Sequence, residues 1–140
     1  MKEPAVFAVV FVNGKICATT REDGTIGLPG GKQEIGELPI ETAMRESEEE
    51  GWKFTGVQLF HQFLTQVVND RLVTWVYLEA GVKKLSDHKE KHRGIVPILC
   101  TVDEIIESGR GNKLAMELVL NIKEHLEKKL KPHLLERGIL

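Results

Sequence analysis

Residues 31–51 read GKQEIGELPIETAMRESEEEG, and the meaning of the flanking sequence follows from this segment. Seven glutamates and one arginine lie between Glu34 and Glu50, which gives a local charge of −6 in a chain whose formal net charge is −2. Pro39 suits the first turn of a helix and Gly51 is a helix stop signal, so we expect a helix from Pro39 to about Glu50. The segment therefore joins a glycine-containing loop to a helix dense in carboxylates.

The expected helix has two distinct faces at about 3.6 residues per turn. The side that would pack on a core carries small and apolar residues: Ile40, Ala43, Met44 and Ser47. Glu46, Glu49 and Glu50 are neighbours on another side, where each like-charge pair costs about 0.2–0.5 kcal/mol and the helix dipole adds to the cost. A hard cation such as Mg²⁺ or Mn²⁺ would offset this repulsion, because it prefers carboxylate and carbonyl oxygens. A solvated acidic face is the alternative interpretation.

Residues before the helix favour a metal site over a solvated face. Gly30 and Gly31 allow a backbone carbonyl to approach closely, and Glu34 offers another oxygen. Glu37 and Arg45 bracket the first two helical turns, and a carboxylate–guanidinium pair between them would tie the loop to the helix.

The flanking segments predict an α+β fold. Asn13-Gly14 is a strong hairpin signal, and a second turn is expected near Asn69-Asp70. β-Branched and aromatic residues predict strands over residues 5–12, 15–20, 57–67, 72–80 and 95–100. Gly81–Gly94 is expected to be a long polar connection. Thr101 and Glu104 fit the capping box of a short helix.

A last helix is expected to start near Asn112 and to end at Pro132. Apolar residues recur along it at a spacing of four, which predicts one core-facing stripe. That stripe consists of Leu114, Leu118, Ile122, Leu126 and Leu130, together with Ala115 and Val119.

The segment Gly31–Glu37, followed by seven residues and then Arg45-Glu46-Ser47-Glu48-Glu49-Glu50, resembles the Nudix box of MutT-like hydrolases. The preceding Leu28-Pro29-Gly30 is also typical of that family. Two positions depart from the family pattern: Ser47 stands where an apolar residue is usual, and Gly51 comes one residue early. The resemblance implies a single Nudix hydrolase domain over residues 1–140 with an α/β/α sandwich around a mixed β-sheet.

The resemblance also implies metal-dependent hydrolysis of a phosphoanhydride bond in a nucleoside diphosphate linked to another moiety, X. The implied cofactor is Mg²⁺ or Mn²⁺, which would neutralise charge on the polyphosphate and lower the pKa of the attacking water. The implied metal ligands are Glu46, Glu49 and Glu50, with Glu34 and the Gly31 carbonyl as additions. Glu49 is the expected general base in this catalytic set, and Glu37 and Arg45 are expected to hold the loop on the helix.

Some family members draw a base from a later loop. The candidates here are Glu90, His88 and His92, with a solvated loop as the favoured alternative. Trp75 and Tyr77 alternate on one face of their strand, where they would stack a nucleobase or pack in the core, and core packing is favoured.

Composition limits the classes of partner that the protein is expected to bind. A net charge of −2 argues against binding of a nucleic acid polymer, and no apolar run approaches the length of a membrane span. Cys17 and Cys100 lie in apolar segments and are expected to be buried free thiols, so a cytoplasmic location is expected. A homodimer is an open alternative to a monomer.

The substrate is less well determined than the family. Neither Pro nor Tyr occurs in residues 66–69, where dinucleotide-handling members often carry one, and no extra N-terminal domain is apparent. Both observations favour a nucleoside or deoxynucleoside triphosphate pyrophosphohydrolase. ADP-ribose and dinucleoside polyphosphates are the alternative substrates, and a non-catalytic nucleotide-binding module is the alternative of another class.

Overall fold

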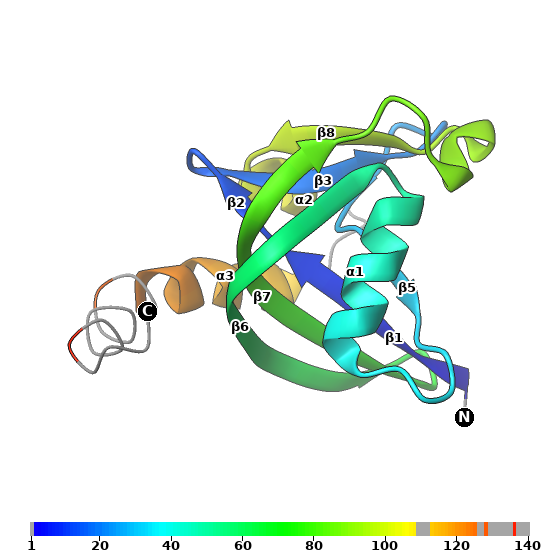
Figure 1. Cartoon of the computed structure of the whole chain (residues 1–140). Coiled ribbons are helices and arrows are strands. Elements are labelled where there is room, and N and C mark those ends of the chain that lie inside the picture. The colour runs from blue at the N-terminus through cyan, green and yellow to red at the C-terminus, as the bar shows by residue number, and fades with distance from the viewer. Residues whose placement is uncertain (1, 109–112, 126–127, 129–135, 137–140) are drawn as a thin grey trace.

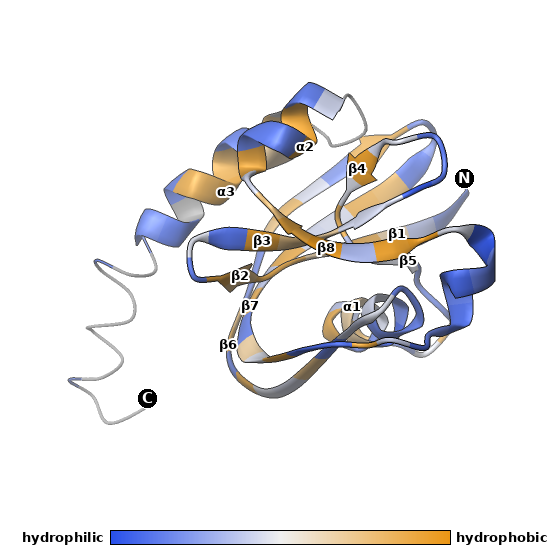
Figure 2. Cartoon of the chain, turned by 90° about the horizontal axis from the view of Figure 1, so that it is seen from above, coloured by the Kyte–Doolittle hydropathy of each residue, from blue (hydrophilic) through white to orange (hydrophobic). Residues whose placement is uncertain are grey.

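The computed structural model describes residues 2–108, 113–125, 128 and 136. The elements in chain order are β1 (Lys2–Val9), β2 (Phe11–Val12), β3 (Lys15–Thr20), β4 (Ile26–Gly27), β5 (Gly30–Lys32), α1 (Pro39–Glu49), β6 (Trp52–Val68), β7 (Arg71–Lys84), the 3-10 helix η1 (Lys89–Arg93), β8 (Val96–Cys100), α2 (Val102–Ser108) and α3 (Lys113–His125). The strands lie between α1 on one side and α2 with α3 on the other (Figure 1, Figure 2).

The strands form two sheets, and the first of them is mixed. Its order is β5-β1-β7-β6, in which β1 and β7 run parallel and the other pairs are antiparallel. The second sheet centres on β3, which pairs with β8 along most of its length and with β2 and β4 at its two ends. The predicted α+β sandwich with a mixed sheet is therefore confirmed.

The first hairpin forms around the expected turn but uses less of the preceding strand. Asn13 and Gly14 have φ of 50° and 82°, which are the positive values that a tight two-residue hairpin turn requires. The single strand expected over residues 5–12 is wrong, because β1 belongs to the first sheet and β2 to the second, with Val10 between them. Residues 5–10 are almost all buried, so hydrophobicity alone could not show where the chain changes sheets.

The central strands β1 and β7 pack on both faces. The face toward α1 buries Val6, Ala8, Val76 and Leu78 together with Ala43 of the helix. The face toward α2 and α3 buries Val9, Trp75, Tyr77, Ile105 and Met116. Both cysteines are buried and free, as expected.

The long hairpin β6–β7 extends beyond the prediction at both strands. β6 begins at Trp52 rather than at residue 57, and β7 ends at Lys84 rather than at residue 80. Gly56 and Gly81, which lie just outside the predicted strands, are within the hairpin, next to a register shift between Thr55 and Leu59. The expected polar connection over residues 81–94 is consequently wrong in its first part, which is strand, and near its end, which forms η1.

The C-terminal helices are only partly as expected. The capping box forms, because the Glu104 N–H donates to Thr101 Oγ1 at 3.2 Å and the Thr101 N–H donates to Glu104 Oε1 at 3.1 Å. Among the residues of α3 whose burial is described, Ala115 and Val119 of the predicted stripe are buried, as expected, whereas Leu114 is 45% exposed and Met116 is buried instead. Residues 126, 130 and 132, which the prediction also named, lie outside the described residues. Among the described residues, no helix combines the length and apolarity needed to cross a membrane.

Candidate active site

One wall of the candidate site is the short strand β5, which runs beside α1. The Gly30 N–H donates to Oε1 of Glu50 at 2.8 Å. A Cβ added at Gly31 would lie 2.5 Å from the carboxylate carbon of Glu46. The glycine backbone therefore lies directly against two of the predicted metal-ligating carboxylates, and at Gly31 there is no space for a side chain beside Glu46.

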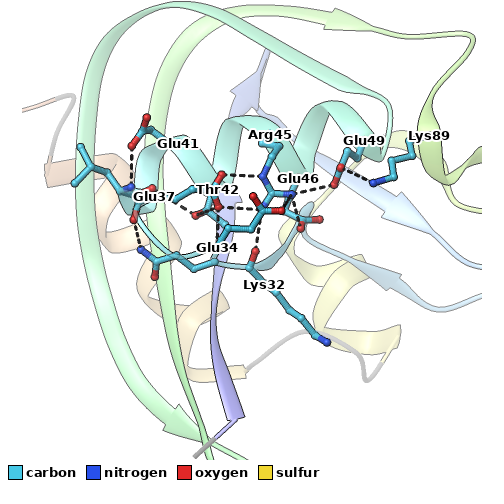
Figure 3. Close-up of polar contacts among 11 residues, drawn as sticks. Lys32, Glu34, Glu37, Glu41, Thr42, Arg45, Glu46, Glu49 and Lys89 are labelled. Carbon is cyan, nitrogen blue, oxygen red and sulfur yellow. Dashed lines mark hydrogen bonds and ion pairs between the residues drawn. The ribbon is translucent and has the colours of Figure 1, made fainter.

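Glu37 and Arg45 form the expected ion pair, in which both carboxylate oxygens take part (Figure 3). Arg45 Nε donates to Oε2 at 2.8 Å and Nη2 donates to Oε1 at 2.9 Å. The Glu34 N–H and the Thr42 hydroxyl also donate to Oε1, at 2.8 and 3.0 Å. Arg45 Nη2 also donates to the Lys32 carbonyl at 2.9 Å. One guanidinium thus joins α1, the preceding loop and β5.

The remaining nitrogen of Arg45 lies among three further carboxylates. Nη1 is 3.0 Å from Glu46 Oε1, 3.2 Å from Glu49 Oε2 and 3.8 Å from Glu34 Oε1. In the part of the chain that the structure describes, no three acidic, His or Cys side chains are arranged to hold a metal ion. The carboxylates are instead paired with cations of the chain itself.

These contacts shift the pKa values of residues in the acidic cluster. Hydrogen bonds from the Arg45 guanidinium lower the pKa of Glu37 to about 2, and the same pair raises the pKa of Arg45. Burial raises the pKa of Glu46 and its neighbour Glu49 raises it further, although the hydrogen bond from Arg45 acts in the opposite direction. Burial and the neighbouring Glu49 carboxylate therefore both disfavour the charged form of Glu46, and an added cation would offset this penalty.

A second element, η1, reaches the same carboxylates. Lys89 Nζ donates to Glu49 Oε1 at 3.0 Å, and this contact raises the pKa of the lysine. His88 of the same segment is turned away, because its Nε2 lies 2.8 Å from the Ile95 carbonyl oxygen.

A cavity of about 1060 Å³ opens over the acidic cluster. The predicted site residues in its wall are Gly31, Glu34, Glu37, Arg45, Glu46, Glu49, Glu50 and Glu90. Arg21, Lys89 and Arg93 bring positive charge to the same cavity from outside α1. His88 is absent from this wall, so the structure brings Glu90 but not His88 to the site.

The two aromatic candidates on β7 lie in the core, which the sequence favoured over stacking on a nucleobase. Trp75 is 4% exposed and stacks on Phe7 with ring centroids 6.2 Å apart, while Tyr77 is 3% exposed and contacts Phe11. Trp75 nevertheless lines a second cavity of about 360 Å³. Arg21 lines both this cavity and the larger one, so the two are neighbours. Tyr77 lines neither of them.

Sequence reasoning missed Arg21 and the specific role of Lys89. Arg21 follows directly after β3, and Lys89 is one of several basic residues between β7 and β8. Only the tertiary fold distinguishes Lys89, which donates to Glu49, from Lys91, which donates to the Ser86 carbonyl.

Solved structures with the same fold are numerous. A NUDIX hydrolase from Nitrosomonas europaea has 19% identity, a TM-score of 0.60, and coverage of 88% of this chain and 89% of its own. A structure described as an ADP compounds hydrolase has 14% identity and a TM-score of 0.65, and the match covers 91% of this chain and 74% of that one. A structure from work on MutT of Aliivibrio salmonicida and Vibrio cholerae has 21% identity and a TM-score of 0.56, over 74% and 83% of the two chains.

Such low identities establish likeness of fold alone, and no curated protein matches the sequence. The family comparison is stronger, because the NUDIX domain model matches residues 1–120. That match covers the glycine strand β5, the acidic helix α1 and both sheets. The chain therefore belongs to the Nudix family.

Proposed function

We propose that this protein hydrolyses a phosphoanhydride bond in a nucleoside diphosphate linked to X, with Mg²⁺ or Mn²⁺ bound by Glu46, Glu49 and Glu50 and with Glu34 as an additional ligand. The observation that carries the proposal is the convergence of Glu34, Glu46 and Glu49 on a single cationic nitrogen of Arg45, in the wall of a cavity of about 1060 Å³. Carboxylates that already gather around one positive charge are suited to a divalent cation.

The donor chemistry of the site fits such an ion. Carboxylate and carbonyl oxygens are the ligands that Mg²⁺ prefers, and the Nudix family is generally dependent on divalent metals. The raised pKa of Glu46 reflects burial and a neighbouring anion, both of which a divalent cation would offset. Binding requires the carboxylates to exchange some of their present partners, because these are now Arg45, Lys89 and the Gly30 N–H.

The carbonyl ligand that we propose is that of Gly30, rather than the Gly31 carbonyl expected from the sequence. Residues of an antiparallel strand point their polar groups alternately toward and away from the partner strand. The Gly30 N–H donates to Glu50 and the Lys32 carbonyl accepts from Arg45, so both residues face α1. Gly31 lies between them, opposite Val6 of β1, so we expect its backbone N–H and carbonyl to point toward that strand.

The chain's own residues have separate tasks in this proposal. Glu49 is the general base, since its carboxylate lies in the cavity wall, 20% exposed and accessible to a water molecule. Arg45 and Glu37 keep the loop and helix in register. A bound divalent cation would supply charge neutralisation for the phosphates and a lowered pKa for water. Arg21 and Arg93 would orient the anionic substrate.

We favour a nucleoside or deoxynucleoside triphosphate as substrate, with ADP-ribose and dinucleoside polyphosphates as the alternatives. The second cavity, of about 360 Å³, suits one nucleoside beside the phosphate-binding region. Trp75 and Phe7 give it an aromatic wall, and Arg21 connects it to the larger cavity. The fold is shared with both a MutT and an ADP compounds hydrolase, so the substrate itself must be measured.

A substrate panel tests this function. Nucleoside triphosphates, oxidised nucleotides, ADP-ribose, dinucleoside polyphosphates and nucleotide sugars are incubated with Mg²⁺ or Mn²⁺, and the products are separated by chromatography. We expect turnover of triphosphates to a monophosphate and pyrophosphate, lowered by about 100-fold or more in Glu49→Gln. Glu48→Gln is the matched control, because Glu48 lies on the same helix but its side chain is 53% exposed and pairs with Lys53. Metal-dependent binding without any turnover would identify a non-catalytic module instead.

A further inference from the structure

The contact between Lys89 and Glu49 joins two elements that are far apart in the sequence. The two residues are 40 positions apart, yet Nζ donates to Glu49 Oε1 at 3.0 Å. Figure 3 shows Lys89 extending from outside α1 to the end of the carboxylate cluster. The Lys89 side chain is 68% exposed whereas that of Glu49 is 20% exposed, so an exposed ammonium pairs with a largely buried carboxylate.

The backbone that carries Lys89 is held by contacts of its own. The neighbouring His88 ring lies 2.8 Å from the Ile95 carbonyl oxygen, and His92 Nδ1 lies 2.8 Å from the Lys89 carbonyl oxygen. Gly94 ends η1 in the left-handed conformation, with φ of 74°. The position of Lys89 is thus fixed at its backbone, and a change of partner is left to its long side chain.

A divalent cation bound to Glu49 weakens the interaction between this carboxylate and Lys89, because two cations on one carboxylate repel each other. A polyphosphate in the cavity offers the displaced ammonium new anionic oxygens within reach of the same flexible stem. Arg45 differs, since it is also fixed by Glu37 and by the Lys32 carbonyl. Of the two described cations that contact Glu49, the lysine is therefore the one that can leave without breaking other contacts of its side chain.

We propose that Lys89 is a positioning residue that competes with the divalent cation for Glu49 in the substrate-free protein and moves to a substrate phosphate when the cation binds. The proposal rests on the function proposed above. It makes two opposite predictions for the loss of the lysine charge: tighter binding of the cation alone and weaker binding of phosphate.

The first measurement is Mn²⁺ binding to substrate-free protein by titration calorimetry. Lys89→Met should bind Mn²⁺ about two- to fivefold more tightly than wild type, which is the scale of one partly exposed ion pair. Lys91→Met is the matched control, because it removes the same charge from η1 but its Nζ bonds the Ser86 carbonyl. Unchanged or weaker Mn²⁺ binding in Lys89→Met overturns the proposal. Equal binding by wild type and Glu49→Gln removes the proposed metal site, and this proposal with it.

The second measurement is the binding of inorganic pyrophosphate to the Mn²⁺-saturated protein. Lys89→Met should weaken pyrophosphate binding by about tenfold or more, since a charge-assisted hydrogen bond is lost, while Lys89→Arg should restore most of it. Lys91→Met should match wild type. Pyrophosphate binding that is the same in Lys89→Met and wild type overturns the proposal even if Mn²⁺ binding behaves as expected, and leaves the metal site intact.

Discussion

Replacing Glu37 with glutamine tests how strongly the ion pair with Arg45 fixes the loop before α1. Arg45, Thr42 and the Glu34 N–H all donate to this carboxylate, and its pKa falls from an ordinary value of 4.5 to about 2. At about 1.4 kcal/mol per pH unit, that fall corresponds to about 3 kcal/mol. Solvent screens part of the interaction, because 29% of the Arg45 side chain is exposed, so we expect Glu37→Gln to cost about 1–2 kcal/mol at pH 7.

The pH dependence gives the sign of the effect. A carboxyl group whose pKa is lowered by folding contributes its full stability above its unfolded-state pKa, near 4.5, and loses that contribution as the pH falls to about 2. Urea unfolding followed by circular dichroism should therefore show a gap between the free energies of unfolding of wild type and Glu37→Gln. This gap should be constant above pH 5 and should narrow below pH 4.5. Glu48→Gln, whose carboxylate is 3.8 Å from Lys53, should change stability by less than about 0.5 kcal/mol. A gap that is no larger than this control, or one that persists unchanged at pH 2.5, would refute the reasoning.

Three further predictions concern the glycines, the helix core and the thiols. Gly31→Ala places a methyl group against the Glu46 carboxylate and should lower activity by about tenfold or more, with a stability change below about 1 kcal/mol. In Gly30→Ala the methyl group meets backbone atoms of β1, so this substitution should mainly destabilise the fold. Equal urea midpoints for the two variants would contradict this difference. Ser47→Ala removes a buried hydroxyl that has no hydrogen-bond partner among the described residues and should raise the free energy of unfolding by about 1 kcal/mol, so a lower melting temperature would count against it. Burial raises the pKa of the two cysteine thiols to about 12 and about 11, so neither should react with a disulfide reagent at pH 8 until denaturant is added.

Local sequence chemistry predicted the parts of the site that lie within one segment. Pro39 starts α1, the spacing of Glu46 and Glu49 puts both carboxylates beside Arg45, and Glu37 reaches that arginine from the loop. These contacts span at most eight residues, so helical geometry is enough to place them. The hairpin at Asn13-Gly14 was predictable for the same reason, since the turn itself requires those residues.

Contacts across the fold were not predictable in this way. Lys89 and Arg21 reach the cavity from connections between strands, and no local pattern distinguishes them from other basic residues. Gly56 carries a positive φ of 58° inside β6, so a residue that usually ends a strand here lies next to a register shift. In α3 the burial of Met116 rather than Leu114 depends on the shape of the core between this helix and the sheets. The spacing of leucines along the sequence does not predict that shape.

The small net charge of −2 is a sum over opposing charges, and the structure places several of these opposing charges at the site itself. Like-charged carboxylates on neighbouring helical turns are unfavourable without a counter-ion, and the described structure meets this cost with Arg45 and Lys89. The two cations differ in how they are held. Arg45 makes two hydrogen bonds to Glu37 and one to a backbone carbonyl, so it remains part of the scaffold when a metal ion arrives. Lys89 is held at Glu49 by its ammonium group alone, so the cation that is least costly to displace is also the one that faces the cavity where phosphates would bind.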